Sequence, residues 1–185
     1  AGPKLALCVH ESMLNGGNWW ELLAGFPLAS EIKCCADLRG ISLKGLPSPT
    51  GFDFSHVALD YADFSGAYLA GACFQRASLT GTNFSNAVLT LTDFFLAVGQ
   101  EVDFSDADLY RGHLAAAHLR QSNFTGANLR FASMSQSTFD GSDFTGAALH
   151  GADFYGASLK EAYFPSESVQ HLNLTEEQIT SLPAP

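Results

Sequence analysis

Histidine and cysteine are the side chains most often used for acid–base, nucleophilic and metal chemistry near neutral pH. The central part of the chain holds His56, His113, His118 and His150. All four occupy positions that the repeating pattern described below turns outward, and His113 and His118 belong to adjacent sides. The four imidazoles therefore do not converge. We predict no catalytic centre, no metal site and no cofactor.

The cysteines and the known catalytic motifs lead to the same expectation. Cys8, Cys34, Cys35 and Cys73 form no CxxC pair and have no matched histidine spacing for zinc. The chain contains no phosphate-binding loop, GxSxG elbow or dinucleotide fingerprint. An enzyme whose active part is residues 1–51, with the rest as scaffold, would need a motif that this stretch lacks. We predict that the protein is not an enzyme.

A five-residue period positions these side chains. From Phe54 to Phe164 every fifth residue is large and apolar, with the single exception of Gly99. This period matches neither the 3.6 residues of a helical turn nor the alternation of a flat strand, so the chain must turn a corner every five residues. The 23 positions are Phe54, Leu59, Phe64, Leu69, Phe74, Leu79, Phe84, Leu89, Phe94, Gly99, Phe104, Leu109, Leu114, Leu119, Phe124, Leu129, Met134, Phe139, Phe144, Leu149, Phe154, Leu159 and Phe164.

A longer period shows how many corners close one coil. The residue two before each large one is mostly small, and residues two apart on an extended segment point the same way, so both face the axis. Every twentieth residue repeats in type, which predicts four sides of five residues and a square coil stacked at about 4.8 Å. One all-Phe ladder contains Phe64, Phe84, Phe104, Phe124, Phe144 and Phe164, and one all-Leu ladder contains Leu69, Leu89, Leu109, Leu129 and Leu149.

The repeated motif resembles that of the pentapeptide-repeat family. It reads Ala-Asp-Phe-Ser-Gly at 62–66 and Ala-Asn-Leu-Arg-Phe at 127–131, and the resemblance covers residues 52–164. It implies an all-β fold, a right-handed quadrilateral parallel β-helix solenoid. Some members of the family protect DNA gyrase from quinolones and look like acidic rods that occupy the DNA groove of the enzyme, usually as dimers. A homodimer is one state that the resemblance implies.

The chain divides into three parts. Residues 1–51 are expected to form an N-terminal capping segment with short helices and two out-of-phase repeats, residues 52–164 the repeat β-helix, and residues 165–185 a C-terminal capping helix. Helix-start signals at 18–21 and 175–178 predict short helical caps at both ends. Leu174, Ile179 and Leu182 are expected to seal the last coil. The one-residue phase shift predicts an inserted loop at 47–50.

Composition limits the partners. The net charge is −10, from 19 acids and 9 bases, and direct binding to nucleic acid needs Lys and Arg, so we do not expect it. No apolar run reaches 18 residues, so no membrane span is predicted. Reduced thiols favour a cytoplasmic location, although a secreted or lumenal location after processing stays open.

One outward ladder alternates Asp and Asn. Such side chains commonly bond nearby backbone at turns, and the alternation keeps like charges about 10 Å apart. The functional alternative is an acidic stripe that imitates a phosphate backbone, with Asp63, Asp103 and Asp143 as its charges.

The departures from the pattern suggest a binding surface. Gly99 removes a core side chain, and Val102 is expected to refill the gap. Several outward positions become apolar nearby, and Leu91, Arg111 and Phe131, twenty apart, should line one edge. A cluster of apolar and Arg residues outside a rod indicates a contact surface, unless residues 1–51 fold back over it. The predicted binding residues are Leu91, Phe95, Leu96, Arg111 and Phe131.

Two functions therefore stand side by side. The first is a non-catalytic protein–protein interaction module with an unidentified protein partner. The alternative is an acidic DNA mimic that binds a DNA-binding enzyme such as DNA gyrase. The repeat region carries only 12 acids against 5 bases and has no projecting loop inside its coils, which favours the first.

Overall fold

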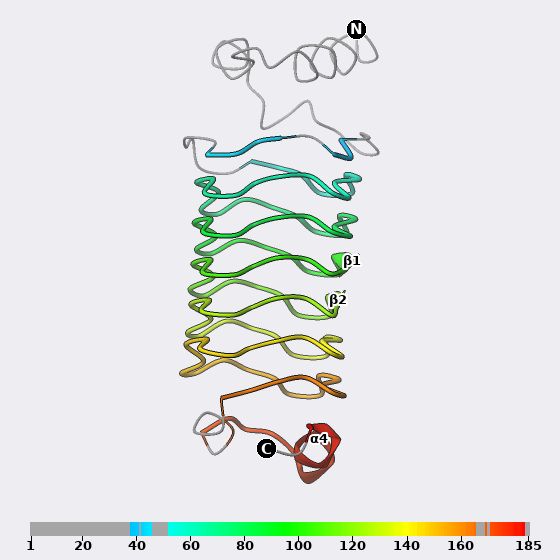
Figure 1. Ribbon diagram of the computed structural model, residues 1–185, viewed down its shortest axis with the longest axis vertical. Helices are drawn as coiled ribbons and strands as arrows, with labels where there is room; N and C mark the ends of the chain where they lie inside the picture. Colours follow the sequence, from blue (N-terminus) through cyan, green and yellow to red (C-terminus); the bar gives the residue numbers. More distant parts are fainter. Residues whose placement is uncertain (1–37, 41, 46–51, 166–168, 170, 184–185) are drawn as a thin grey trace, which may run out of the picture.

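The structure, a computed structural model, describes residues 38–40, 42–45, 52–165, 169 and 171–183. The repeat region is a stack of coils (Figure 1). Each coil pairs in parallel with the next, and the partners are twenty residues apart, as in Asp63 with Asn83 and Asp143 with Tyr163. Backbone bonds such as Phe64 N–H to Asn83 O, 2.7 Å, join the coils. The predicted square coil is confirmed.

Regular strand is short because the chain turns every five residues. Within the described residues, two three-residue strands appear, β1 (Val98–Gln100) and β2 (His118–Arg120). They pair in parallel with Gly99 opposite Leu119, and the other coils pair through single bridges. The sheet character of the fold is therefore spread along the four sides of the stack.

Each corner is a tight turn with one residue in the left-handed region. That residue is the second after each large core residue, and it has positive φ, as at Gly66 (65°) and Asn86 (59°). Glycine adopts this conformation without strain, whereas a side chain with a Cβ is strained there. At the corners, therefore, the type of the outward residue decides how much backbone strain the turn carries.

Stacked phenylalanine rings form the core. Along the all-Phe side, successive rings from Phe64 to Phe164 lie with centroids 4.7–5.2 Å apart and planes within 11° of parallel. At Gly99 the missing side chain is replaced by Val102, whose Cγ2 lies 2.8 Å from where a Cβ on Gly99 would be. Val102 is fully buried. The prediction that Val102 refills this gap is confirmed.

The first described coil is one residue out of phase. Ser42 pairs with Asp63, 21 residues away instead of twenty, and Leu43 N–H bonds to Asp63 O at 2.6 Å. The extra residue falls between Leu43 and Phe54. The helix expected at 18–21 and the loop expected at 47–50 lie outside the described residues.

Helix α4 (Glu176–Ser181) lies across the C-terminal end of the stack (Figure 1). Thr175 and Gln178 form the capping box that the sequence predicts. The Gln178 side chain is buried, and its Nε2 donates to the carbonyl oxygens of Phe154 and Ala157, both at 2.9 Å. It therefore satisfies backbone acceptors that no further coil can reach.

The apolar seal of this end differs from the prediction at one residue. Leu172, Leu174 and Leu182 pack against the core. Ile179 does not, because its side chain is 46% exposed. The buried position of α4 that faces the coil is taken by Gln178, so the expected role of Ile179 is wrong.

Candidate binding surface

Three of the predicted binding residues form one column on a corner of the stack. Leu91, Arg111 and Phe131 occupy the same corner in successive coils, with φ of 58°, 54° and 58°. Leu91 is 64% exposed and Phe131 is 48% exposed. The sequence prediction that these three line one edge is supported by their shared corner position.

A second column, which the sequence analysis did not single out, runs directly beside the first. Each corner residue donates its backbone N–H to a carbonyl of the second column, at 3.0 Å in all three cases. The pairs are Leu91 with Tyr110, Arg111 with Arg130, and Phe131 with His150. We call these six residues the aromatic–arginine surface.

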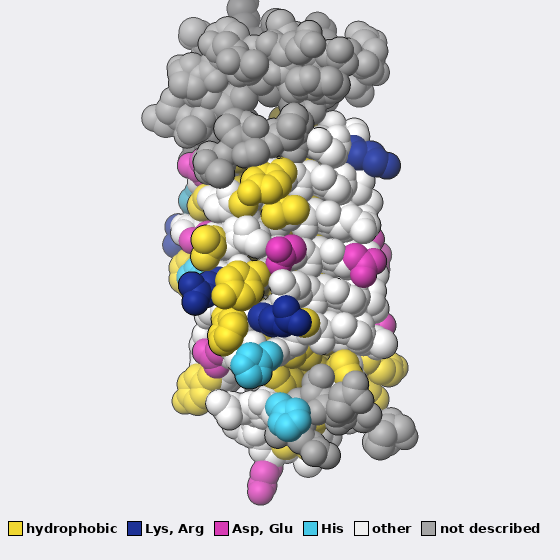
Figure 2. All heavy atoms as spheres, turned by 90° about the vertical axis from the view of Figure 1, so that its left-hand side faces the viewer, with side chains coloured by type: hydrophobic (Ala, Val, Ile, Leu, Met, Phe, Trp, Pro, Cys, Tyr) yellow, Lys and Arg dark blue, Asp and Glu magenta, His cyan; other side chains and the backbone are white. Residues whose placement is uncertain are grey.

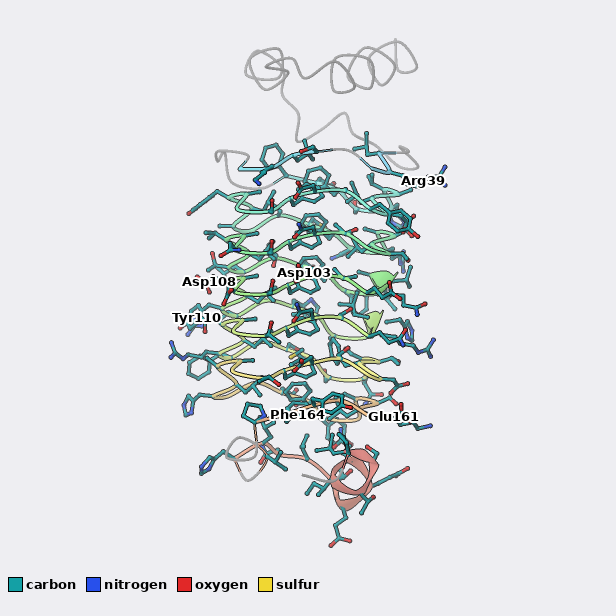
Figure 3. All side chains as sticks on the ribbon, in the orientation of Figure 1. Arg39, Asp103, Asp108, Tyr110, Glu161 and Phe164 are labelled. Atoms are coloured by element: carbon teal, nitrogen blue, oxygen red, sulfur yellow. The ribbon has the colours of Figure 1, made fainter. Side chains whose placement is uncertain are left out.

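Side-chain contacts bind the two columns together. The Phe131 ring meets the Tyr110 ring edge to face, with centroids 5.9 Å apart, and the His150 ring in the same way at 5.5 Å. The Arg111 guanidinium carbon lies 5.4 Å from the centroid of the Tyr110 ring, within cation–π range. Figure 2 shows this side of the molecule, with hydrophobic, Arg and His side chains gathered over the middle and lower coils. Tyr110 is labelled on the same side, at the left, in Figure 3.

The two arginines of this surface have no carboxylate partner in the part of the chain that the structure describes. The ion pairs among the described residues are His113 with Asp93 and Arg120 with Asp140, and neither involves Arg111 or Arg130. Asp108 lies on the same side, but its Oδ1 accepts from Tyr110 N–H and from Asn128 Nδ2. Two guanidinium groups on hydrogen-bonded neighbours are therefore left without a counter-charge within the described chain.

Glycines bound this surface at both ends of the corner column. Gly71 precedes Leu91 by one coil and Gly151 follows Phe131 by one coil, both with positive φ. The Phe131 ring lies over Gly151, with Cδ1 2.6 Å from where a Cβ would be. The large side chains thus replace glycine only across the three middle coils.

The structure separates Phe95 and Leu96 from this surface. Phe95 and Leu96 form the turn at the next corner of their coil, with Leu96 in the left-handed region (φ 59°). Phe95 stacks on the His113 ring with centroids 5.6 Å apart and planes 2° from parallel. Both side chains are half-buried, and a binding role for them stays a prediction.

Asp93 lies on the side that leads from the Leu91 corner to the corner formed by Phe95 and Leu96. Its carboxylate accepts from Gln75 Nε2 at 2.6 Å and from Phe95 N–H at 2.9 Å, and it lies 3.0 Å from His113 Nδ1. Burial pushes the pKa of Asp93 upward, but these three hydrogen-bond partners outweigh it and hold the pKa below its usual value. These contacts of Asp93 join three successive coils, so the cluster has a structural role.

The acidic ladder bonds to its own backbone. Asp63, Asp103 and Asp143 each accept the backbone N–H of the residue two ahead, at 2.8–2.9 Å. Asn83 and Asn123 do the same at 2.9 and 3.0 Å, and Asn123 Nδ2 donates to Asp103 Oδ1 at 3.2 Å. These are turn-capping bonds of the kind that Asp and Asn make readily.

The histidines do not converge. His113 contacts Asp93, and His118 Nδ1 lies 3.1 Å from Thr138 Oγ1 on another side. In the described part of the chain, no three His, Cys, Asp or Glu side chains are arranged to hold a metal ion. Among the same residues, no helix has the length and apolar character to cross a membrane. Cys73 is a free thiol whose pKa is raised, chiefly by burial.

A comparison with protein families identifies the family of this chain. The family described as pentapeptide repeats matches residues 50–86, 72–98, 103–141 and 122–161, more than half of the chain. The chain therefore belongs to the pentapeptide-repeat family, and its coil is the right-handed quadrilateral β-helix of that family. No curated protein matches the chain.

Similar solved structures are also pentapeptide-repeat folds. A pentapeptide repeat protein from the Arabidopsis thaliana thylakoid lumen is 24% identical over 60% of this chain and 70% of its own, with a TM-score of 0.42. HetL from Nostoc, involved in heterocyst differentiation regulation, is 20% identical over 80% of each chain, with a TM-score of 0.37. QnrB1, a plasmid-mediated fluoroquinolone resistance protein, is 17% identical over 79% of this chain and 90% of its own, with a TM-score of 0.43.

Proposed function

We propose that this pentapeptide-repeat protein is a non-catalytic interaction module that binds a partner protein through the aromatic–arginine surface. The observation that carries the proposal is the pair of exposed apolar side chains, Leu91 and Phe131, beside two arginines that have no ion-pair partner among the described residues. Aromatic residues and arginine are the types that supply most binding energy at protein interfaces. Proteins of this family are generally non-catalytic structural or interaction modules.

The corner positions present the side chains of this surface to solvent. A non-glycine residue in the left-handed region is less stable there by about 1–2 kcal/mol. Glycine occupies the same corner one coil before Leu91 and one coil after Phe131. Eleven other non-glycine residues occupy corners with the same positive φ, so strain alone does not mark this surface. What distinguishes it is that Leu91 and Phe131 expose large apolar side chains there.

The sequence alone leaves open that residues 1–51, and not a partner protein, cover this surface. Most of that segment lies outside the described residues, so the proposal rests on the six residues themselves. Their exposure is what a partner would remove from water, at about 25 cal/mol for each Å² of apolar area.

Affinity capture from the native lysate tests the proposal. Leu91→Asp/Phe131→Asp should lose a partner that wild type retains, because charges replace the apolar contacts. The matched control is Tyr61→Asp, a 69% exposed aromatic residue on the opposite corner of the stack, which should retain it. Circular dichroism checks that each variant keeps the β-helix. Capture of the same proteins by all three forms would contradict the proposal.

A further variant asks whether the surface extends around the corner. Phe95→Asp removes the ring that stacks on His113. If the neighbouring side also contacts the partner, Phe95→Asp should weaken capture while the fold is kept. Unchanged capture would confine the interface to the two columns.

The second candidate function is an acidic DNA mimic that binds a DNA-binding enzyme such as DNA gyrase. One observation favours it: from Asp63 to Asp143, the side with the acidic ladder carries acids and no basic residue. Against it, Asn83 and Asn123 interrupt the charges, and every carboxylate also caps a turn. A gyrase supercoiling assay decides this. Inhibition or quinolone protection by wild type, lost in Asp63→Asn/Asp103→Asn/Asp143→Asn, would favour the mimic.

A further inference from the structure

We infer that the partner reaches the aromatic–arginine surface with an acidic segment, a stretch of protein chain that carries Asp or Glu carboxylates next to an apolar side chain. The inference rests on the proposed function and names the chemistry of its partner. It follows from the charges of the surface, from the position of its rings and from the charge of the rest of the molecule.

The carboxylates are inferred from Arg111 and Arg130. The two residues are joined by a backbone hydrogen bond of 3.0 Å between adjacent columns, so two positive side chains leave the rod close together. Neither has an ion-pair partner among the described residues. Guanidinium groups match carboxylates in shape and can donate two parallel hydrogen bonds to each. A carboxylate-bearing segment would also relieve the repulsion between the two cations.

The apolar neighbour is inferred from Phe131 and Leu91, which flank Arg111 within the corner column. Phe131 contacts both Tyr110 and His150, so the ring stands fixed between the two columns. An apolar side chain that covers this ring removes water from the guanidinium groups nearby. Ion pairs gain strength when water is excluded around them, so the apolar and the charged contacts support each other.

The charge of the rest of the chain argues for a protein segment over a nucleic acid. The whole chain carries −10, and Asp106 and Asp108 lie five and three residues before Arg111 in the same coil. A nucleic acid presents a continuous line of phosphates and would run from the two arginines onto these acids. A short acidic segment can place its carboxylates on the arginines alone.

Fluorescence anisotropy with labelled peptides and the full chain tests the inference. The acidic probe carries several Glu and Asp residues around one Leu and one Phe. A second probe has Gln and Asn in their place, a third has Lys, and a fourth is an oligothymidylate with the same number of negative charges. We expect the acidic peptide to bind at least about tenfold more tightly than the neutral one, with an affinity that falls as salt increases.

Charge reversal locates the site. Arg111→Glu/Arg130→Glu should weaken the acidic probe by about tenfold or more. The matched control is Arg76→Glu/Lys160→Glu, which changes the net charge equally on other parts of the rod and should leave the affinity within about twofold. Neither Arg76 nor Lys160 has an ion-pair partner among the described residues. Circular dichroism confirms that both double variants keep the fold, and Arg111→Gln/Arg130→Gln serves if reversal disturbs it.

The outcomes separate this inference from the proposed function. Equal binding of acidic and neutral peptides, stronger binding of the oligothymidylate, equal weakening by both charge reversals or no binding of the acidic probe would each overturn the inference. If lysate capture still depended on Leu91 and Phe131 in that case, the proposed function would stand with a partner of other chemistry. Capture that ignored Leu91 and Phe131 would remove the proposed function itself.

Discussion

Two surfaces of the same coil stack differ in what their side chains do. On the acidic ladder, the outward Asp and Asn side chains accept backbone N–H groups two residues ahead. On the aromatic–arginine surface, the side chains contact one another, and Arg111 and Arg130 have no carboxylate partner among the residues described. The backbone is nearly the same in both, because each coil repeats the last.

This difference separates residues that build the repeat from residues that the repeat only carries. A side chain that satisfies the backbone of its own turn has a structural reason to be there, whatever else it does. A bulky residue at a strained corner has no such reason, and its side chain is presented to solvent. In a repeat protein, the unexplained departures are therefore better guides to binding than the regular ladders.

The largest expected change in the free energy of unfolding comes from a substitution in the acidic ladder. Asp103→Ala removes the acceptor of Ser105 N–H and of Asn123 Nδ2, and we expect it to lower the free energy of unfolding by about 1–2 kcal/mol. Chemical denaturation measures the loss.

Asp103→Asn is the matched variant, because Asn83 makes the same turn bond one coil earlier. It should stay within about 0.5 kcal/mol of wild type. Equal losses in the two variants would show that the charge matters and that the turn bond does not. An unaffected Asp103→Ala would remove the structural role of the ladder.

A second prediction concerns Asp93, on the side between two corners. Its pKa is held below the usual value, despite burial, by bonds from Gln75, Phe95 and His113. A lowered pKa in the folded state adds stability at neutral pH that is lost as pH falls through the range below about 4. Relative to Asp93→Asn, wild type should therefore lose stability more steeply on acidification. Parallel pH profiles of the two proteins would contradict this role.

The sequence predicts the fold well because the fold is a period. Twenty-residue recurrence of Phe and Leu fixes four sides and parallel stacking, and the bridges from Asp63 to Tyr163 follow that register. The sequence also predicts that the Val102 side chain fills the core space beside Gly99, because both positions face the axis. The exposure of Ile179 could not be predicted in this way. The buried position of the helix is taken by the amide of Gln178, where the pattern predicts an apolar side chain.

The candidate surface could be predicted only in part. A period of twenty finds neighbours within one column, such as Leu91, Arg111 and Phe131. It misses contacts between columns, which join residues 19 and 21 apart, as Phe131 does with His150 and Tyr110. Closeness in sequence also misleads, because Phe95 and Leu91 stand at successive corners with one side of the coil between them. Side-chain contacts across a turn need coordinates.

The smallest expected change in stability comes from Phe131→Gly, and it tests most directly how the aromatic–arginine surface differs from the acidic ladder. Phe131→Gly relieves the left-handed strain at φ 58°, which is worth about 1 kcal/mol, and loses ring contacts of about the same size. The free energy of unfolding should therefore change by less than about 1 kcal/mol, while affinity for the acidic probe falls. Denaturation and anisotropy on the same samples check both. A loss of stability above about 2 kcal/mol would make Phe131 a structural residue, and the aromatic–arginine surface would then resemble the acidic ladder instead of contrasting with it.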